Sequence, residues 1–440
     1  MEIASELAAI AGEPNVFRDS GTLGAYFRTP VDTSRLLAVA PGSTEEVCRI
    51  VRACRNSGTA LFTTYDTFFP QDAAWRGGVL LDFCRMDRIE RIDSKNLCVH
   101  IQRGVTFEQL EKALAPEGLT VLKPAAATTR SVVCHAVSRG MNLAAAKYPE
   151  VQASNLQVVL EDGEIHRTGS HANSEEMADW KEDGGPNLSK WYLGADDIFG
   201  IVVRASIWVY PRFEGRRFGA FGFQRPEPAL GLLRNLPRKE LPQECLVLDR
   251  RSFSARFVGT VQDELPPWIL LTGVEAFAEL AEYQHRKIRD AALRDGGFEM
   301  DPDLTARAGN SLDRPWYATP ERQTAFYTLF SRIPEFEAVL FRTISEAGLP
   351  PESAARTYVA HGLGRAVWCQ YEVCDGDGRG ILEKLERRLV PAGAYFDRPQ
   401  GRLAEEIYGT VPAWLGHVRK IKNMMDPGRI FNPGRPVPEV

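Results

Sequence analysis

A short loop in the first fifth of the chain, TTYDTFFPQ, carries side chains suited to holding an anion. Thr63, Thr64 and Tyr65 provide three hydroxyl donors in succession, and such donors can hydrogen-bond to phosphate oxygens. Asp66 follows directly and adds a negative charge, which repels a phosphate at close range. The loop has no glycine, so its backbone is less free to approach an anion. The pattern indicates phosphate binding that Asp66 weakens.

A second set of chemical groups follows one strand-like pattern, HGLGRAVWCQYEV. His361, Arg365, Tyr371 and Glu372 could face a bound substrate from this strand. Successive side chains of a strand point to opposite faces, so only about half of the four can share one side. We name His361 and Arg365 as candidate catalytic residues, with the alternative that each is an ordinary sheet or surface residue.

Composition limits the class of protein. The 440 residues, 44% hydrophobic and 25% charged, predict a soluble globular protein of two or three domains. A net charge of -5 disfavours nucleic-acid and anionic-membrane partners and favours a small-molecule ligand. The N-terminal residues lack a signal-peptide pattern and no run approaches a membrane span, so we expect a cytoplasmic protein. The eight cysteines include no CxxC pair and no zinc-ligand spacing, which predicts reduced thiols and no metal.

The elements of the first half alternate between helix and strand. STEEVCRIVRACRNSG predicts a helix capped by Ser43 and Glu46 and ended by Gly58. GGVLLDF predicts a buried strand, and RIERIDSKNLCVHIQRGV predicts a hairpin. FEQLEKALAPEG predicts a short helix, after which further strands are expected within 155–169 and 199–211.

From about residue 212 the sequence pattern changes to strands separated by helices such as EYQHRKIRDAALRD. This change predicts a separate domain. The polar segment 301–323, rich in Pro and Gly, is expected to be a surface excursion.

Six segments carry a resemblance to a known family. They are PGSTEEVCRIVRAC, GGVLLDFCRMDRIERID, GVTFEQLEKAL, LQVVLEDGEIHRTG, GADDIFGIVVRASIWVYP and KIKNMMDPGRIFNPGR. In this order they resemble the FAD-linked oxidases of the vanillyl-alcohol oxidase and p-cresol methylhydroxylase superfamily. The resemblance implies an α+β fold: an FAD-binding domain of two subdomains, with an antiparallel-sheet cap domain over the isoalloxazine ring. It implies an FAD-binding domain at 1–211, a cap at 212–390 and a C-terminal return at 391–440.

The loops that would hold the FAD diphosphate depart from the family pattern. The first loop of the family resembles S-x-G-x-N-x-G-Y-G, where this chain has TTYDTFFPQ. The second loop usually has glycine and asparagine where this chain has Val133, Cys134 and His135. The candidate cofactor-binding residues are Thr63, Thr64, Tyr65, Val133, Cys134, His135, Arg139, Gly140, Gly194, Gly200, Ile201 and Asn432. His135 is either a phosphate or flavin donor or a space-filling residue, and both interpretations stay open.

The resemblance also supplies catalytic candidates. GAYFDRPQG is similar to the tyrosine-arginine segment of the family, so Tyr395 and Arg398 are candidates to hold a phenolate or carboxylate. Ser138 stands where phenol-oxidising relatives carry an aspartate, so that base is missing. The surroundings of Cys134 differ from the cysteine motifs of covalently flavinylated relatives, and TTYDTFFPQ has no histidine. Any FAD should therefore be non-covalent, and it is held weakly or lost.

Two functions follow from the resemblance. The first is an FAD-dependent oxidoreductase, an oxidase or dehydrogenase, that removes a hydride from a small alcohol, a 4-alkylphenol-like compound or a hydroxy acid. The second is a flavin-poor or flavin-free member of the fold, acting as a non-oxidative enzyme or a structural subunit. Expected partners are the small-molecule substrate, an electron carrier or a paralogous subunit, and a second copy in a homodimer.

The charge at Asp66 makes a testable prediction. Asp66→Asn should increase FAD retention, because it removes repulsion of the diphosphate. The measurement is the flavin-to-protein ratio of wild type and variant, both loaded with excess FAD and then desalted. A full complement of tightly held flavin in the wild type would contradict the prediction.

Overall fold

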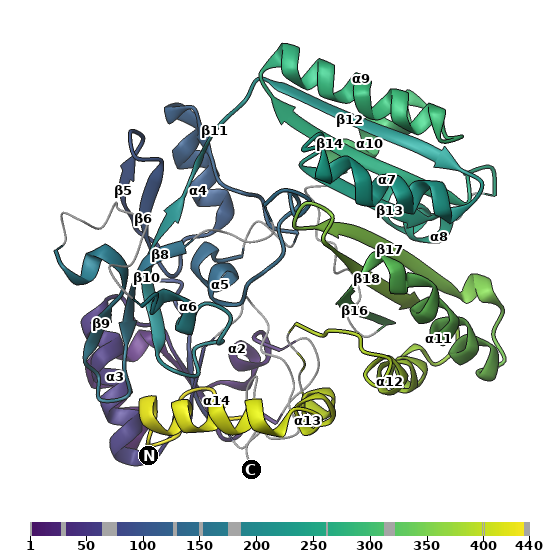
Figure 1. Ribbon diagram of the computed structural model, residues 1–440. Coiled ribbons are helices and arrows are strands. Elements are labelled where there is room, and N and C mark those ends of the chain that lie inside the picture. Colours follow the sequence, from purple (N-terminus) through teal and green to yellow (C-terminus); the bar gives the residue numbers. More distant parts are fainter. Residues whose placement is uncertain are drawn as a thin grey trace.

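The computed structural model describes residues 2–27, 32–63, 77–125, 130–148, 153–174, 186–260, 263–311, 322–397, 399 and 401–434. Three larger sheets form its framework, two in the N-terminal half and one between Gly215 and Val373. Figure 1 shows them as two lobes, with the C-terminal helices returning beneath the N-terminal lobe.

The first sheet is small and mostly parallel. Its order is β1-β2-β4-β3, with bounds Val16–Phe17, Leu36–Val39, Gly78–Leu81 and Leu61–Thr63. The helices of this part are α1 (Glu2–Ala11), α2 (Ser20–Gly24) and α3 (Thr44–Ser57). The helix predicted after Ser43 is confirmed: Ser43 Oγ accepts a hydrogen bond from the Glu46 N–H at 3.2 Å, and Gly58 ends α3 at φ 62°.

The second sheet is antiparallel and buries the core of the N-terminal lobe. Its order is β5-β6-β10-β8-β9, with bounds Ile89–Asp93, Cys98–Gln102, Ile201–Trp208, Ala153–Val159 and Ile165–Arg167. The helices α4 (Phe107–Leu114) and α5 (Val132–Val137) contribute buried side chains to the same core. A two-stranded ribbon of β7 (Leu119–Thr120) and β11 (Tyr210–Pro211) leads from this lobe into the next.

The third sheet is the antiparallel cap predicted from the resemblance. Its order is β15-β12-β14-β13-β17-β18-β16, with bounds Phe298–Glu299, Gly215–Phe223, Trp268–Ala276, Glu244–Asp249, Ala354–His361, Ala366–Val373 and Gln323–Thr328. The accompanying helices are α7 (Pro226–Arg238), α8 (Arg250–Phe253), α9 (Ala278–Arg294), α11 (Ile333–Glu346) and α12 (Gly378–Leu389). The α+β fold with an antiparallel cap is thereby confirmed.

The cap contains a helix that the sequence analysis did not predict. Residues Pro302–Ser311 form a helix, α10, inside the segment predicted as a surface excursion. Asp301 Oδ1 accepts hydrogen bonds from the Asp303 and Leu304 N–H groups at 2.9 and 3.1 Å, and Pro302 occupies the first turn. Proline is favourable there because its missing N–H would be unpaired anyway. Residues 312–321 lie outside the described part of the chain.

The C-terminal segment crosses back to the first sheet. After α13 (Gly401–Gly409) and α14 (Pro412–Met425), Phe431 forms a parallel bridge with Leu61 of β3. Asp426 is fully buried and accepts hydrogen bonds from the Ile430 and Phe431 N–H groups, both at 3.0 Å. Lys422 pairs with the same carboxylate. The segment therefore packs on the N-terminal lobe, while the domain boundaries stay a prediction.

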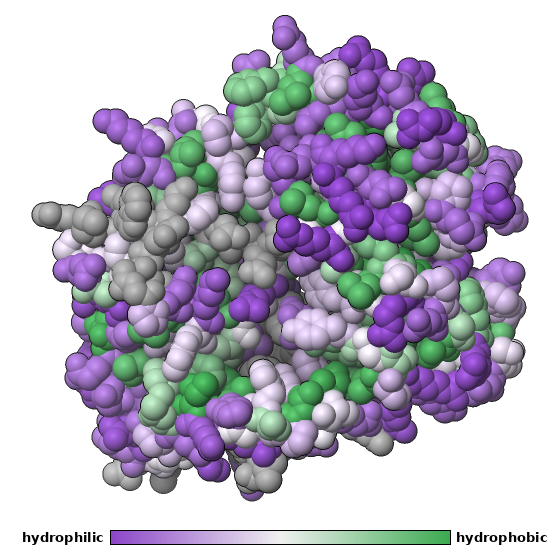
Figure 2. All heavy atoms as spheres, viewed as in Figure 1, coloured by the Kyte–Doolittle hydropathy of each residue, from purple (hydrophilic) through white to green (hydrophobic). Residues whose placement is uncertain are grey.

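The surface drawn in Figure 2 is mostly hydrophilic, with apolar side chains scattered among charged ones and a hollow between the two lobes. Scattered apolar side chains are normal on a folded protein. This hollow lies where the two lobes face each other in Figure 1.

Asp426 generates a stability prediction. Asp426→Asn should lower the free energy of unfolding by about 3 kcal/mol, because Lys422 and two backbone donors lose a charged acceptor. Urea denaturation followed by circular dichroism measures the change. The exposed Glu405 on α13 provides the matched acid-to-amide control, Glu405→Gln, for which no change beyond about 0.5 kcal/mol is expected. Equal effects of the two substitutions would refute this role of Asp426.

Candidate active site

The first phosphate loop begins at a residue that is already bonded inside the lobe. Thr63, 2% exposed, ends β3, and its hydroxyl donates to Asp197 Oδ2 at 2.8 Å. Its N–H donates to Asn432 Oδ1 at 3.0 Å, and Asn432 Nδ2 donates to the Thr63 hydroxyl at 3.1 Å. Two predicted cofactor residues, Thr63 and Asn432, therefore contact each other. Thr64, Tyr65 and Asp66 lie outside the described residues.

The second loop opens α5. Ser131 caps this helix, because its hydroxyl accepts a hydrogen bond from the Cys134 N–H at 3.0 Å. Val133, Cys134 and His135 are all buried.

The His135 ring meets Phe107 edge-on at 5.3 Å, inside the lobe. A Cβ atom at Gly140 would lie 2.1 Å from that ring, so only glycine fits beside it. His135 therefore packs inside the lobe, and whether it also acts as a phosphate or flavin donor stays a prediction.

A third loop, GADDIFG at 194–200, lies against the second. The Gly194 N–H donates to the Val137 carbonyl of α5 at 2.6 Å. A Cβ atom at Gly194 would lie 2.7 Å from Arg139 Nε, so the exposed Arg139 side chain crosses this glycine. Gly200 has φ 150° and precedes Ile201, the first residue of β10. Arg139 thus lies against Gly194, and contact of Arg139, Gly194, Gly200 and Ile201 with a cofactor stays a prediction.

A buried ion pair joins these loops at their base. The Arg103 and Asp197 side chains are each 2% exposed, and two guanidinium nitrogens contact the two carboxylate oxygens at 3.0 and 2.5 Å. Asp197 Oδ1 also accepts a hydrogen bond from the Val202 N–H at 3.1 Å. We call Thr63, Arg103, Asp197 and Asn432 the buried junction. It connects both N-terminal sheets to the C-terminal segment.

One donor of the buried junction, Arg103 Nε, makes no hydrogen bond within the described residues. Burial opposes the charge of Arg103, but the Asp197 carboxylate and the Cys134 side chain outweigh it and raise the Arg103 pKa. Arg103 Nε is buried and has no hydrogen-bond partner within the described residues. A buried cationic donor beside Cys134 of the second loop suits a diphosphate. The residues present therefore fit the cofactor that the resemblance implies.

A second group of side chains lies where the C-terminal segment meets the cap. Tyr327 of β16 exchanges two backbone hydrogen bonds with Tyr395, at 2.7 and 3.0 Å. The Tyr327 ring lies 4.9 Å from the ring of His361, the last residue of β17, and 6.4 Å from the Tyr395 ring. The structure therefore brings the candidates His361 and Tyr395 to the two sides of Tyr327.

Asp397 and Tyr408 complete this group. The charge of the Asp397 carboxylate acts to raise the pKa of His361, Tyr395 and Tyr408. The cation of Arg139 acts to lower the pKa of Tyr395. We call Tyr327, His361, Tyr395, Asp397 and Tyr408 the interlobe cluster.

Protonation states in the interlobe cluster follow from burial and charge. Burial lowers the His361 pKa, and the Asp397 carboxylate opposes this only in part. Partial desolvation and Asp397 raise the Tyr395 pKa, against the opposing charge of Arg139. Burial, followed by Tyr395, Asp196 and Asp397, raises the pKa of Tyr408 to about 12. At neutral pH the cluster therefore offers a neutral imidazole and protonated phenols.

The remaining candidates lie elsewhere. Arg365 is exposed in the turn between β17 and β18, and Arg398 falls outside the described residues. Tyr371 is fully buried in the core of the cap. The sequence analysis missed Arg103, Tyr327, Asp397 and Tyr408. For Arg103 a signal existed, because a cation directly after the buried strand β6 needs a partner.

Neither a metal-binding cluster nor a membrane-spanning helix is found in the described part of the chain. No group of three or more His, Cys, Asp or Glu side chains is placed there to hold a metal ion. Among the same residues, no helix has the length and apolar character required to span a bilayer.

Comparisons with known proteins agree with this architecture. The FAD binding domain family matches residues 36–169. An uncharacterized FAD-linked oxidoreductase of Mycobacterium tuberculosis is 24% identical over 429 residues, which cover 90% of each chain. p-Cresol methylhydroxylase with bound substrate matches with a TM-score of 0.82 at 19% identity, covering 99% of this chain and 96% of the other. 4-Ethylphenol oxidase from Gulosibacter chungangensis matches with a TM-score of 0.81 and the same identity and coverage.

The buried junction generates the next prediction. Arg103→Met should lower the free energy of unfolding by about 3–5 kcal/mol, because it leaves the Asp197 carboxylate buried without its cation. Adding Asp197→Asn should recover part of this loss, so the double variant costs less than the sum of the single ones. Urea denaturation of the wild type and the three variants measures the coupling.

The exposed pair of Arg294 and Asp295, 3.3 Å apart, provides the matched control. Arg294→Met should change stability by at most about 0.5–1 kcal/mol, because water screens exposed pairs. Additive effects at Arg103 and Asp197 would mean that the two residues do not act as a pair.

Proposed function

Because the chain belongs to the FAD-linked oxidoreductases of the vanillyl-alcohol oxidase and p-cresol methylhydroxylase superfamily, we propose that it oxidises a small phenol or other hydroxyl-bearing aromatic compound. The reaction would take place at the interlobe cluster. The observation that carries the proposal is that the His361 and Tyr395 rings both lie against the Tyr327 ring, where the C-terminal segment meets the cap.

The FAD would be held non-covalently by the three loops. Arg103 Nε, the backbone at the start of α5 and the glycines Gly194 and Gly200 are the groups that would contact it. When bound, FAD supplies the acceptor for a hydride from the substrate. The side chains of the protein must orient the substrate and accept its proton.

His361 is the group suited to accept the substrate proton. Its lowered pKa keeps the imidazole neutral at neutral pH, so one ring nitrogen can accept a proton. The Asp397 carboxylate nearby would stabilise the imidazolium that forms. This pair supplies the base that is missing at Ser138.

Tyr395 is the group suited to hold the substrate oxygen. It is 62% exposed, so a ligand can reach it, and its raised pKa keeps the hydroxyl protonated. The protonated Tyr395 hydroxyl would donate a hydrogen bond to the phenolate that forms on the substrate, and the Arg139 cation would add to the attraction. Arg398 stays a proposed partner in the same role.

The substrate class rests on relatives as well as on these residues. One of the similar structures is a 4-ethylphenol oxidase, and 4-cresol dehydrogenase of Pseudomonas putida is 26% identical over 219 residues. Both names specify substituted phenols, which agrees with the donors of the interlobe cluster. A homodimer, an electron carrier and a cytoplasmic location belong to the same proposal.

One observation favours the flavin-poor alternative. The Thr63 hydroxyl is bonded to Asp197 and Asn432, so it is engaged inside the lobe rather than with a phosphate. A member that has lost FAD would show no flavin reduction with any phenol. That result would leave a non-oxidative enzyme or a structural subunit.

The base assignment generates a kinetic prediction. His361→Gln should lower kcat/KM for 4-ethylphenol by about 10²–10⁴-fold, the usual loss on removal of a general base. The wild type should lose activity only at a pH below the ordinary histidine pKa, because burial lowers the His361 pKa and the imidazole takes a proton from solvent only in more acidic solution. The variant should lack this acid limb. Dye-linked turnover of the FAD-loaded enzyme across pH measures both effects.

Two controls separate catalysis from folding. The exposed His417 on α14 provides His417→Gln, which should leave kcat/KM unchanged. Tyr395→Phe should lower kcat as well as kcat/KM, because it removes a donor to the oxygen on which charge develops in the transition state. An unchanged acid limb in His361→Gln would exclude His361 as the base.

A further inference from the structure

The helix α9 presents a group of exposed apolar side chains on the surface of the cap. Phe277, directly before the helix, is 71% exposed, and Leu280 and Tyr283 are each 46% exposed. The buried side chains of the helix, among them Ala281 and Ile288, belong to the cap core. Figure 1 shows α9 on the outside of the cap lobe. Apolar side chains gathered in this way on a surface are typical of a contact with another protein.

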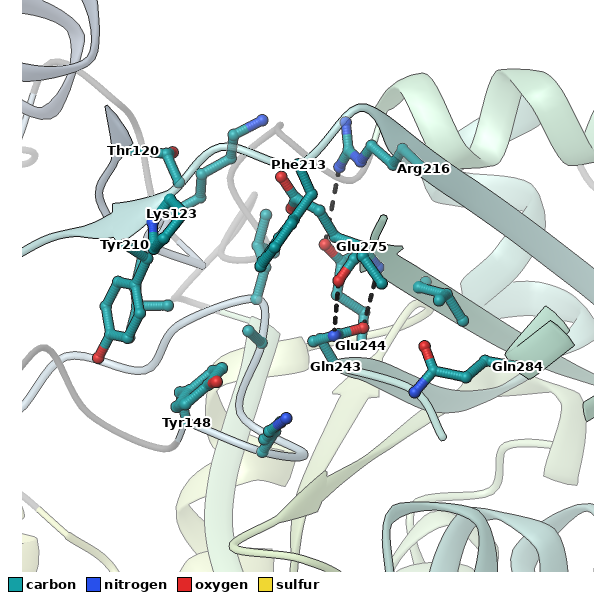
Figure 3. Close-up of a pocket in the computed structure, with 18 of the residues that line it drawn as sticks. Thr120, Lys123, Tyr148, Tyr210, Phe213, Arg216, Gln243, Glu244, Glu275 and Gln284 are labelled. Carbon is teal, nitrogen blue, oxygen red and sulfur yellow. Dashed lines mark hydrogen bonds and ion pairs between the residues drawn. The ribbon is translucent and has the colours of Figure 1, made fainter. Parts of the chain in front are cut away.

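The same end of α9 borders a cavity of about 240 Å³. Phe277, Leu280 and Gln284 line it together with residues such as Tyr148, and Figure 3 shows Tyr148 and Gln284 on opposite sides of it. Because Phe277 and Leu280 line the cavity and are also exposed, the cavity reaches the surface beside them. A protein that covered this part of α9 would remove apolar surface from water, which is favourable.

Three exposed residues form a row along α9, one turn of the helix apart. Glu279 precedes Tyr283 by four residues, and Lys287 follows it by four. Residues four apart lie on one face of a helix, so the row runs from a negative charge through an aromatic ring to a positive charge. Lys287 Nζ lies 5.4 Å from the centre of the Tyr283 ring. We call Glu279, Tyr283 and Lys287 the α9 row.

The α9 row is complementary to a second copy of itself. When two copies of the helix lie antiparallel about a two-fold axis at Tyr283, Glu279 of each chain faces Lys287 of the other. The two Tyr283 rings then meet at the centre of the contact, with Leu280 of each chain beside them. The charges of the row cancel, so it offers no patch of one sign to a highly charged protein. A second copy of the chain is the partner that matches both ends of the row.

We propose that the α9 row is the two-fold contact of a homodimer. This inference rests on the homodimer included in the proposed function and assigns its surface, whereas the oxidation of a phenol plays no part in it. Two pairs of Glu279 and Lys287 set the antiparallel direction of the helices. Tyr283 and the neighbouring Leu280 and Phe277 supply the apolar surface that the contact buries.

The test is sedimentation equilibrium of the full-length protein at low salt, where exposed charges are least screened. The wild type should dimerise. Glu279→Lys makes both ends of the row positive and Lys287→Glu makes both ends negative, so each single variant should raise the dimer Kd at least about tenfold. An equimolar mixture of the two single variants should dimerise again, because each end then faces an opposite charge. The double variant Glu279→Lys/Lys287→Glu should dimerise as the wild type does, for the same reason.

The exposed pair of Arg379 and Glu383 on α12, 3.6 Å apart, provides the matched control. Glu383→Lys also reverses the charge of an exposed helical glutamate, and it should leave the dimer Kd unchanged. Circular dichroism establishes that each variant is folded. The double variant gives an independent measurement if one of the single variants fails to fold.

Three results would overturn the inference. They are a wild type that stays monomeric at every concentration, single variants that dimerise as the wild type does, and single variants whose dimer is restored neither by mixing nor in the double variant. The first result would also remove the proposed homodimer, and the second would keep the homodimer and move it to another surface. The proposed oxidation is tested separately by turnover of 4-ethylphenol, so its failure is distinguishable from all three.

Discussion

The buried ion pair between Arg103 and Asp197 is the constraint on which the candidate site depends. Two charges that are each 2% exposed must be paired, because an unpartnered charge inside a protein costs several kcal/mol. The pair fixes the loop before β10 against the end of β6, and through Thr63 and Asn432 it also fixes β3 and the C-terminal segment. The three loops assigned to the diphosphate start from this shared point.

The same arrangement explains where the chemistry is placed. The C-terminal segment must pass from the cap back to β3, and on its way Tyr395 pairs with Tyr327 of the cap. This path carries Tyr395 to Tyr327, whose ring also contacts His361. The C-terminal segment and the cap therefore meet at these three side chains.

The sequence predicted those elements whose stabilising contacts lie between residues close together in the chain. The helix after Ser43 has its cap, its apolar spacing and its terminal glycine within sixteen residues, and it forms as predicted. The helix at Pro302 was missed because Pro and Gly were weighted above the capping aspartate before it. Tyr327 and His361 were not predicted to meet, because their contact depends on strand order in the cap sheet. The resemblance selected Thr63 and Asn432, but not their mutual hydrogen bond or the role of Arg103.

The central claim is that these loops hold FAD without a covalent bond, with the altered first loop weakening the hold. The most direct measurement is the flavin-to-protein ratio of the wild type as purified, after loading with excess FAD and desalting, and in the supernatant after acid precipitation. We predict less than one flavin per chain as purified, an increase on loading that stays below one after desalting, and complete release by acid. Loaded protein that retains no flavin, or flavin that stays with the acid precipitate, would contradict the account.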